Sequence, residues 1–392
     1  MRVTVGQEQL HKALSHVARV VGPRVAFGAP GTVLLATDAG RLRLAATNLE
    51  VSVTCWVECA VDGEGAVAVP VRLLADVVAA LPPEALRLDL ATDTLALRIH
   101  AWRGETICDA TIRGSDSKDF PNVGSPPYDR PGTLTASIAP ELLREMIGRT
   151  IFAAAAEEGP AVLTGIHARF ADGRLTLAAT DRHRAAVCSV EIEGAPKGDL
   201  AVIVPARALG ELARASGEAW EPVAVAVAAD RRQLRGRAGP IEVRTQLLEG
   251  NFPDVAGLIP RRHDTRTVAD RAILQDLLRL ALLFARGDGN RVRVTLAPDA
   301  GGAGGCLVLG ADGAEAGDSA GRLSAEVTGP GGEFLFNGRY LRDALSAVRT
   351  AQVALETRGP TGAVVVRPVG DGDLDHMQLV MPLHPAFATA SA

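Results

Sequence analysis

The sequence predicts an α+β fold in which one domain occurs three times in tandem. Two segments are near-copies, RLRLAATNLEVSV at 41–53 and RLTLAATDRHRAAV at 174–187. Each precedes a similar helical segment, at 69–82 and 204–216, and a more divergent copy of that segment lies at 336–349. Corresponding positions are roughly 130 residues apart, which is the size of a domain and too large for a solenoid repeat. Strand-like and helix-like stretches in every copy place the chain in the α+β class.

Length and composition agree with three domains. The chain has 392 residues, of which 47% are hydrophobic and only 4% aromatic, so valine, leucine and alanine must fill most of each core. Segments rich in proline and glycine, at 124–132 and 252–264, mark the linkers. We therefore predict domains at 1–126, 132–254 and 261–392.

The predicted strands form hairpin pairs, most of them joined by short turns that contain glycine or aspartate. In chain order the pairs are 32–37 with 41–46, 86–91 with 94–101, 162–170 with 173–179, 223–228 with 232–237, 291–297 with 305–310, and 351–357 with 362–367. Two helices per domain fit the remaining periodic stretches, with Pro70, Pro140 and Pro205 near three of their starts. They are 7–21, 71–81, 139–154, 206–215, 269–285 and 338–349. We expect the helices to cover one face of antiparallel sheets.

Five scattered cysteines predict no disulfide framework, because their number is odd. They are Cys55, Cys59, Cys108, Cys188 and Cys306. Cys55 and Cys59 lie four residues apart in a strand-like run, on one face. We interpret them as half-buried apolar groups in a reducing cytosol rather than as metal ligands.

No targeting or membrane segment is predicted. The amino terminus, MRVTVGQEQL, lacks the apolar core of a signal sequence, and the longest apolar stretch, 272–285, contains Gln275, Asp276 and Arg279. We expect a soluble, cytoplasmic protein with no metal and no cofactor.

Positive charge concentrates in the predicted helices. The net charge is −5, yet the helical stretches with their flanking residues carry 13 Lys or Arg and 8 Asp or Glu, against 28 and 38 elsewhere, when counted over 7–21, 70–82, 139–154, 205–216, 269–287 and 337–350. Pairs such as Arg207 and Arg214 are seven residues apart and therefore share a helix face, opposite the apolar stripe. An ordinary solvated face with pairs such as Arg207–Glu211 or Arg72–Asp76 is one interpretation. Recurrence at matched positions in all three copies favours a surface that binds anions.

The sequence contains no strong signal for catalysis. It lacks a phosphate-binding P-loop, a G-x-S-x-G elbow and an H-E-x-x-H motif, and GGAGG at 301–305 is more typical of a hairpin. Asp181, His183 and Arg184 form one compact titratable cluster. A turn whose Asp and His bond the backbone is favoured, a binding surface is the main alternative, and catalysis, which would need a nucleophile, is the least favoured.

Eight segments in order along the whole chain resemble the bacterial DNA polymerase III β subunit, the β sliding clamp. They are AATNLEVSV (45–53), VPVRLLADVVAALP (69–82), FPNV (120–123), AATDRHRAAVCSV (178–190), VPARALGELA (204–213), LLEGNFPDV (247–255), FNGRYLRDAL (336–345) and VMPL (380–383). The resemblance implies three tandem clamp domains and a head-to-tail homodimer whose six domains close a ring around duplex DNA. It also implies a processivity factor that performs no bond chemistry itself.

In such a ring the basic helices would line the hole and meet phosphates through non-specific, salt-sensitive contacts. The candidate DNA-binding residues are Arg24, Arg72, Arg144, Arg149, Arg207, Arg214, Arg279 and Arg342. The candidate ring-interface residues are Leu283 and Phe284, although their helical run could equally be core.

The resemblance further implies a pocket between the second and third domains for short apolar motifs of the polymerase III α subunit, the clamp loader and repair polymerases. Its deep part would comprise Leu163, Thr180, Arg182, Ala185, Pro253, Leu258, Leu379 and Met381. Its shallower part would comprise His183, Arg184, Asn337, Tyr340, Pro382 and Leu383. Apolar walls with a few polar groups suit a peptide anchored by Leu or Phe.

Several positions depart from the family pattern. Arg182 stands where members usually carry a small residue, and Ala185 where they carry leucine. The chain continues through 384–392 after the Met-Pro pair, and 25–31 lacks the usual Leu-Pro-Ile-Leu-like run. These departures leave open a divergent paralogue with an altered pocket, serving a specialised polymerase or escaping an inhibitor. If Arg182 and the tail obstruct the pocket, glycine at position 182 should restore peptide affinity.

Overall fold

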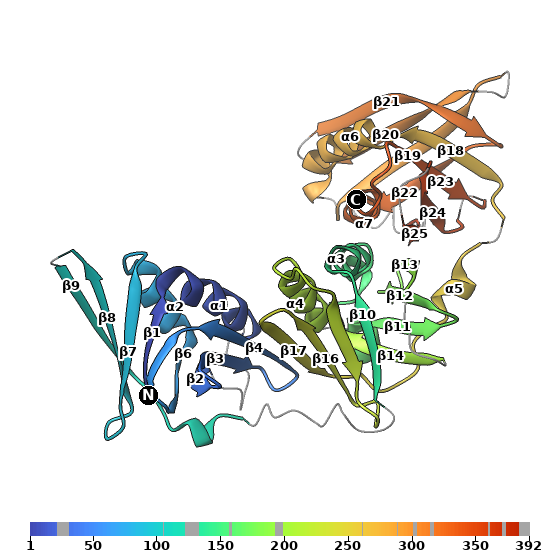
Figure 1. The fold of residues 1–392 in the computed structure, drawn as a ribbon. Helices are drawn as coiled ribbons and strands as arrows, with labels where there is room; N and C mark the ends of the chain where they lie inside the picture. The colour runs from blue at the N-terminus through green and yellow to red at the C-terminus, as the bar shows by residue number, and fades with distance from the viewer. Residues whose placement is uncertain are drawn as a thin grey trace. The chain divides into compact units, whose positions relative to one another are not determined.

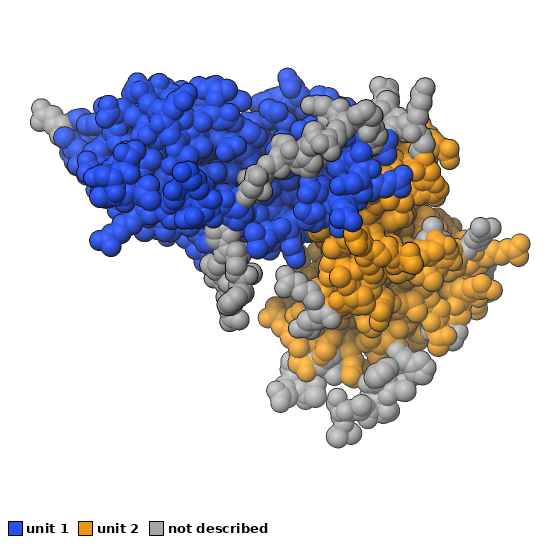
Figure 2. All heavy atoms as spheres, turned by 90° about the horizontal axis from the view of Figure 1, so that it is seen from below, with its two compact units in different colours: residues 1–144, 207–247 blue, residues 145–206, 248–392 orange. Residues whose placement is uncertain are grey.

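The computed structural model describes residues 1–21, 31–104, 106–121, 133–156, 159–192, 199–260, 262–287, 289–300, 304–313, 317–359, 361–370 and 374–383 (Figure 1). Contacts divide the chain into two compact units (Figure 2). Unit 1 comprises 1–144 with 207–247, and unit 2 comprises 145–206 with 248–392. The central part of the chain therefore contributes to both units.

Unit 1 contains two antiparallel sheets. One has the strand order β5 (Ala60–Gly63), β1 (Arg2–Gly6), β7 (Ala85–Ala91), β8 (Ala96–Arg103) and β9 (Thr106–Arg113). The other has the order β10 (Leu134–Ile138), β15 (Val223–Val227), β16 (Gln233–Ala238), β17 (Ile241–Gln246), β4 (Val51–Glu58), β3 (Arg41–Thr47), β2 (Thr32–Asp38) and β6 (Ala66–Pro70). Strand β17 pairs with β4, with Val243 opposite Val53, so this sheet runs from the first predicted domain into the second.

The helices of unit 1 are amphipathic and pack their apolar faces on the sheets. They are α1 (Gln7–Val20), α2 (Val71–Ala80) and α4 (Ala206–Ser216), and α3 (Pro140–Gly148) begins here and ends in unit 2. Leu10, Leu14 and Val17 recur at helical spacing in α1 and are fully buried. Helices α1 and α2 lie side by side (Figure 1), and Gln7 Nε2 donates to the Val78 carbonyl at 2.7 Å between them.

Unit 2 contains one long antiparallel sheet. Its order is β14 (Leu200–Pro205), β11 (Gly165–Ala171), β12 (Arg174–Thr180), β13 (Arg184–Glu191), β25 (Asp375–Val380), β24 (Val364–Val369), β23 (Gln352–Thr357), β18 (Thr265–Asp270), β21 (Gly317–Thr328), β20 (Gly305–Gly313), β19 (Arg291–Pro298) and β22 (Gly332–Asn337). Helices α6 (Arg271–Phe284) and α7 (Gly338–Ala347) contact each other, and α5 (Val255–Leu258) contacts β12 and β13. The pairing of β13 with β25 joins the second and third predicted domains.

The predicted α+β class and the six antiparallel hairpins are confirmed, but the predicted pairs omit further strands, such as β9, β21 and β25, and several predicted elements differ at their ends. The helix predicted at 139–154 ends at Gly148, and a 3-10 turn, Ile151–Ala153, follows; between them the Thr150 hydroxyl donates to the Met146 carbonyl at 3.0 Å. The strand predicted from 162 begins at Gly165, after a second 3-10 turn, Ala161–Thr164. Short 3-10 turns also occur at Ser117–Asp119 and Ala285–Gly287. The predicted domain boundaries remain predictions.

All five cysteines are free thiols, and three of them, Cys55, Cys188 and Cys306, are buried. Burial raises the pKa of the Cys55 thiol to about 12. In the part of the chain that the structure describes, no helix is long and apolar enough to cross a membrane. Among the same residues, no group of three or more His, Cys, Asp or Glu could hold a metal ion.

Candidate functional site

The turn between β12 and β13 is held by its own side chains. The Thr180 hydroxyl donates to the Arg184 carbonyl at 2.7 Å and accepts the Arg182 N–H at 3.1 Å. Asp181 Oδ1 accepts the N–H groups of His183 and Arg184, both at 2.9 Å. The turn places Arg182 in the left-handed region, with φ of 78°. The interpretation of this segment as a turn whose aspartate bonds the backbone is confirmed.

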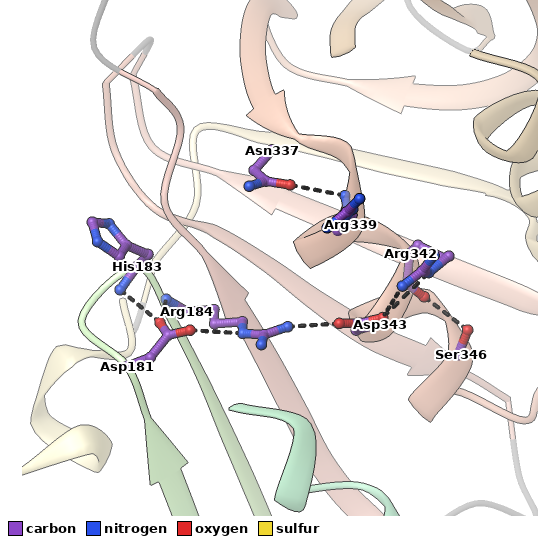
Figure 3. Close-up of polar contacts among 8 residues, drawn as sticks. All are labelled: Asp181, His183, Arg184, Asn337, Arg339, Arg342, Asp343 and Ser346. Atoms are coloured by element: carbon purple, nitrogen blue, oxygen red, sulfur yellow. Dashed lines mark hydrogen bonds and ion pairs between the residues drawn. The ribbon is translucent and has the colours of Figure 1, made fainter. Parts of the chain in front are cut away.

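Arg184 connects this turn to α7. Its Nε donates to Asp181 Oδ2 at 2.9 Å, and its terminal nitrogen donates to Asp343 Oδ2 at 2.7 Å (Figure 3). The guanidinium carbon lies 4.4 Å from the centre of the Tyr340 ring and 5.6 Å from that of Phe152. Such contacts contribute about 0.5–2 kcal/mol each, depending on their burial. Arg184 is therefore held from several sides.

Among the residues that the structure describes, no backbone group bonds the His183 ring, contrary to the turn interpretation. The imidazole stacks on Tyr340 instead, with the ring centres 6.3 Å apart. The Asp181 carboxylate is occupied by the turn N–H groups and by Arg184. The cluster therefore has the geometry of a rigid surface feature, in which Asp181 is not positioned as a free general base.

The predicted deep pocket residues come from four segments of unit 2. Ala185 and Leu379 lie directly opposite each other in the β13–β25 ladder, and both pack in a small core with Ala178 and Val255. Leu163 and Thr180 are also buried, with Leu163 in the 3-10 turn before β11. The remaining members are exposed: Arg182, Pro253, Leu258 and Met381. Leu258 and Met381 present large apolar side chains, 59% and 38% exposed.

The shallower predicted residues surround the start of α7 and the chain after β25. Asn337 caps α7, because its Oδ1 accepts the Arg339 N–H at 3.0 Å (Figure 3). Tyr340 is half-buried beneath His183 and Arg184. Pro382 and Leu383 are half-buried, and the Leu383 N–H donates to the Leu335 carbonyl at 2.7 Å. The Met381 N–H donates to the His183 carbonyl at 2.9 Å, which brings the post-β25 segment against the turn.

Six of the eight predicted DNA-binding arginines are exposed on helices. They are Arg72, Arg144, Arg207, Arg214, Arg279 and Arg342. Arg279 and Arg342 pair with Asp276 and Asp343, at 2.8 and 3.1 Å. The predicted Arg207–Glu211 pair does not form, because Glu211 binds Arg214. Arg207 donates instead to the carbonyls of Arg19 and Val20, at 3.1 and 2.7 Å. Arg24 lies outside the described residues.

Arg149 was predicted to bind DNA, but its side chain is only 3% exposed, so it does not fit that role. It donates to the Ala347 carbonyl at 3.0 Å, forms an ion pair with Glu145 and contacts the ring of His376. A guanidinium enclosed in this way has no access to a phosphate. The helix predicted at 139–154 included Arg149, but α3 ends at Gly148.

The two predicted interface residues differ in exposure. Leu283 is 51% exposed, whereas Phe284 is half-buried against the core of the third predicted domain. The structure adds a feature that the sequence analysis missed, which is the edge strand β9. Ile107 on this strand is 62% exposed, and β9 pairs only with β8 among the described strands. The predicted strand pairs do not include this strand, and no sequence pattern shows that it lies at an edge.

A polar cavity of about 330 Å³ lies at the five-stranded sheet, where Arg2, Asp89 and His100 are among its lining residues. Burial would raise the pKa of Asp89, but hydrogen bonds and charge from Arg2 and Arg87 outweigh it and lower the pKa. None of the predicted site residues lines this cavity.

Comparison with known proteins identifies the class. Family models described as the N-terminal, central and C-terminal domains of the DNA polymerase III beta subunit match residues 1–123, 137–254 and 256–384. The beta sliding clamp of Synechococcus elongatus is 31% identical over 386 residues, covering 98% of this chain and 99% of that protein. The beta sliding clamp of Pseudomonas putida is 29% identical, covering 98% and 100%.

Solved structures give the same result. The DNA polymerase III subunit beta of Pseudomonas aeruginosa has a TM-score of 0.83 at 29% identity, covering 98% of this chain and 100% of that one. The Bacillus subtilis sliding clamp, at 19% identity and a TM-score of 0.85, shares the fold over 98% and 99% of the two chains. The protein is thus a three-domain sliding clamp with helices on antiparallel sheets. The chain belongs to the DNA polymerase III beta subunit family, and the comparisons favour clamp function over a divergent paralogue.

Proposed function

We propose that two copies of this chain close head-to-tail into a ring around duplex DNA and tether the replicative polymerase. One observation carries the proposal: exposed arginines occur on helices of all three predicted domains, as with Arg72, Arg207 and Arg342. Their guanidinium groups would meet phosphates without reading bases, as sliding requires. The domains 1–126, 132–254 and 261–392 would each contribute such a helix pair. The protein would act in the cytoplasm, where the chromosome lies.

The protein would contribute topology and tethering rather than bond chemistry. Membership of the beta sliding clamp family implies a processivity factor, and the compact titratable cluster here is committed to holding a turn. A tether raises the effective concentration of the polymerase at the primer end without any new catalytic group.

Ring closure would use exposed apolar surface in the first and third domains. Edge strand β9 carries Ile107, and α6 carries Leu283, each more than half exposed. An edge strand offers unpaired N–H and C=O groups to another chain, so a second copy would cover both the apolar and the polar surface. Phe284 would support Leu283 from the core side.

Partner proteins would bind the surface around the β13–β25 junction through short peptides. Exposed Leu258 and Met381 would contact an apolar anchor, and Asn337 and His183 would supply polar groups at the edge. The expected partners are the polymerase III α subunit, the clamp loader and repair polymerases. A Pseudomonas aeruginosa clamp that is 29% identical has been crystallised with griselimycin.

Retention on circular DNA tests the ring. The protein is loaded with a clamp loader on nicked circular DNA, and the bound fraction is measured before and after a restriction enzyme linearises the circle. Release upon linearisation, with retention on uncut circles, is the expected result. Equal retention on both forms would overturn the ring, because a protein held only by charge does not sense the DNA ends.

A further inference from the structure

The six exposed helix arginines differ in what they contact. Three of them form an ion pair with a carboxylate on their own helix: Arg214 with Glu211 of α4, Arg279 with Asp276 of α6, and Arg342 with Asp343 of α7. The α6 and α7 pairs are 2.8 and 3.1 Å long, and Figure 3 shows the second of them. Each of these arginines therefore carries its own counter-charge.

The other three arginines keep an uncompensated charge. Arg72 and Arg144 have no ion pair among the residues that the structure describes, although Asp76 lies four positions after Arg72 on α2. Arg207 donates to two backbone carbonyls, which are neutral groups. The difference follows the domains in part, because both arginines predicted to bind DNA in the third domain are paired.

The α6 pair lies on the open surface of its helix. The side chains of Arg279 and Asp276 are 77% and 67% exposed. Ile273 and Leu280, three positions before Asp276 and four after it, are 51% and 46% exposed and share its face of the helix. This part of α6 therefore presents apolar side chains and a neutralised cation rather than free positive charge.

A paired carboxylate weakens the attraction between an arginine and a phosphate. An exposed ion pair is weak enough for a phosphate to replace the carboxylate. The displaced carboxylate stays on the same turn of the helix, however, and its charge repels the phosphate from a few ångströms away. A pair without net charge also releases fewer of the counterions on DNA, so it adds less to the affinity and to its salt dependence.

We propose that Glu211, Asp276 and Asp343 loosen the hold of the helices on DNA, so that phosphate contacts are short-lived and the ring slides freely. The inference rests on the DNA-encircling role proposed above and assigns these acidic residues a part in it. Asp276 is the residue at which the effect can be isolated. Glu211 is only 5% exposed and Asp343 also binds Arg184, whereas Asp276 binds Arg279 alone among the described side chains.

The test compares the full-length wild type with Asp276→Asn. Fluorescence anisotropy measures the Kd for a short labelled duplex over a range of salt concentrations. The same proteins are then loaded by a clamp loader on end-blocked DNA, and single-molecule tracking measures their diffusion along it. We expect Asp276→Asn to bind roughly two- to fivefold more tightly at low salt and to diffuse more slowly, with both differences fading as salt screens the charges.

Two arginine variants and one control locate the cause. Combining Arg279→Gln with Asp276→Asn should remove most of the gain in affinity, because the carboxylate acts through its partner. Arg72→Gln should weaken binding more than Arg279→Gln does, because it removes an uncompensated charge. Glu58→Gln is the matched control: Glu58 is exposed on β4 and has no ion pair among the described residues, so the substitution changes the net charge equally. Its affinity and diffusion should equal those of the wild type.

The outcomes separate this inference from the DNA role itself. If Asp276→Asn binds and diffuses like the wild type while Arg72→Gln weakens binding, the inference is overturned and the DNA role stands. If a variant that combines Arg72→Gln, Arg144→Gln and Arg207→Gln binds DNA like the wild type, the DNA role proposed for these helices is overturned. An equal gain in Glu58→Gln would assign the effect to net charge and also contradict the inference.

Discussion

Arg184 of β13 and Asp343 of α7 form an ion pair at 2.7 Å, which ties a strand of the second predicted domain to a helix of the third. Their side chains are 14% and 26% exposed, so water screens the pair only partly. The same guanidinium also binds Asp181 and covers the Tyr340 ring. One residue therefore connects the β12–β13 turn, α7 and the surface proposed to bind peptides.

Replacing Asp343 by asparagine should loosen this junction. Arg184 would keep Asp181 but lose its second carboxylate. We expect the free energy of local opening around the β12–β13 turn to fall by about 1–2 kcal/mol, which lies between the contributions of exposed and buried ion pairs. Hydrogen exchange at the Met381 amide, which bonds the His183 carbonyl, measures the change. Asp276→Asn, in a pair that is 67% and 77% exposed, should leave that amide unchanged. Equal effects of the two substitutions would contradict the role of Arg184.

Arg144 and Arg149 should behave in opposite ways despite their proximity in sequence. Arg149→Ala removes a buried cation and should lower the free energy of unfolding by about 3 kcal/mol, measured by calorimetry. Arg144→Ala removes an exposed side chain and should change stability by less than about 0.5 kcal/mol. If Arg144 contacts a phosphate, its loss should reduce the slope of the logarithm of the DNA-binding constant against the logarithm of the salt concentration by about 1. A stable Arg149→Ala variant with a reduced slope would restore Arg149 to the DNA-binding set.

Glu218 should give unit 1 a pH-dependent stability. Burial alone would raise its pKa, but hydrogen bonds from His16 and Lys12, at 3.0 and 3.1 Å, outweigh burial and lower the pKa. A lowered folded pKa stabilises the protein above the ordinary glutamate pKa of about 4.3, and this contribution is lost as pH falls through the folded value. Glu218→Gln should therefore cost roughly 1–2 kcal/mol at pH 7 and progressively less below pH 4.

Urea unfolding followed by tryptophan fluorescence reports this difference, because all three tryptophans lie in unit 1. Glu221→Gln is the control, since Glu221 is exposed and has no ion pair among the described residues. If Glu218→Gln lowers the free energy of unfolding by the same amount from pH 7 to pH 3.5, the lost contacts do not depend on the ionisation of Glu218.

Charge introduced at the proposed ring interface should separate the subunits. Ile107→Asp on β9 and Leu283→Asp on α6 each place a carboxylate on exposed apolar surface, so the folded monomer should tolerate them while association weakens. Light scattering after size exclusion measures the mass, with Leu49→Asp, at an equally exposed leucine outside the proposed interface, as the control. Dimers of unchanged stability in both variants would place the interface elsewhere.

Local sequence patterns predicted most secondary-structure elements within a few residues. Apolar spacing in α1 and α4, and alternation in the β3 and β12 strands, are properties of a few consecutive residues, so they can be recognised without tertiary contacts. The helix ends were harder to predict, because they depend on side-chain caps such as Asp270, whose carboxylate accepts the Ile273 N–H at the start of α6.

The sequence by itself determined the threefold repeat, the two helices of each copy and the recurring arginines, because each is encoded in neighbouring residues. Only the tertiary structure decided which of those arginines remain exposed. Arg149 is enclosed by Ala347 and His376, which lie far along the chain, whereas Arg182 is left exposed by a turn that the fold uses twice. Burial depends on the segments that pack over a side chain, and the β17–β4 and β13–β25 pairings that join the predicted domains are long-range contacts of this kind.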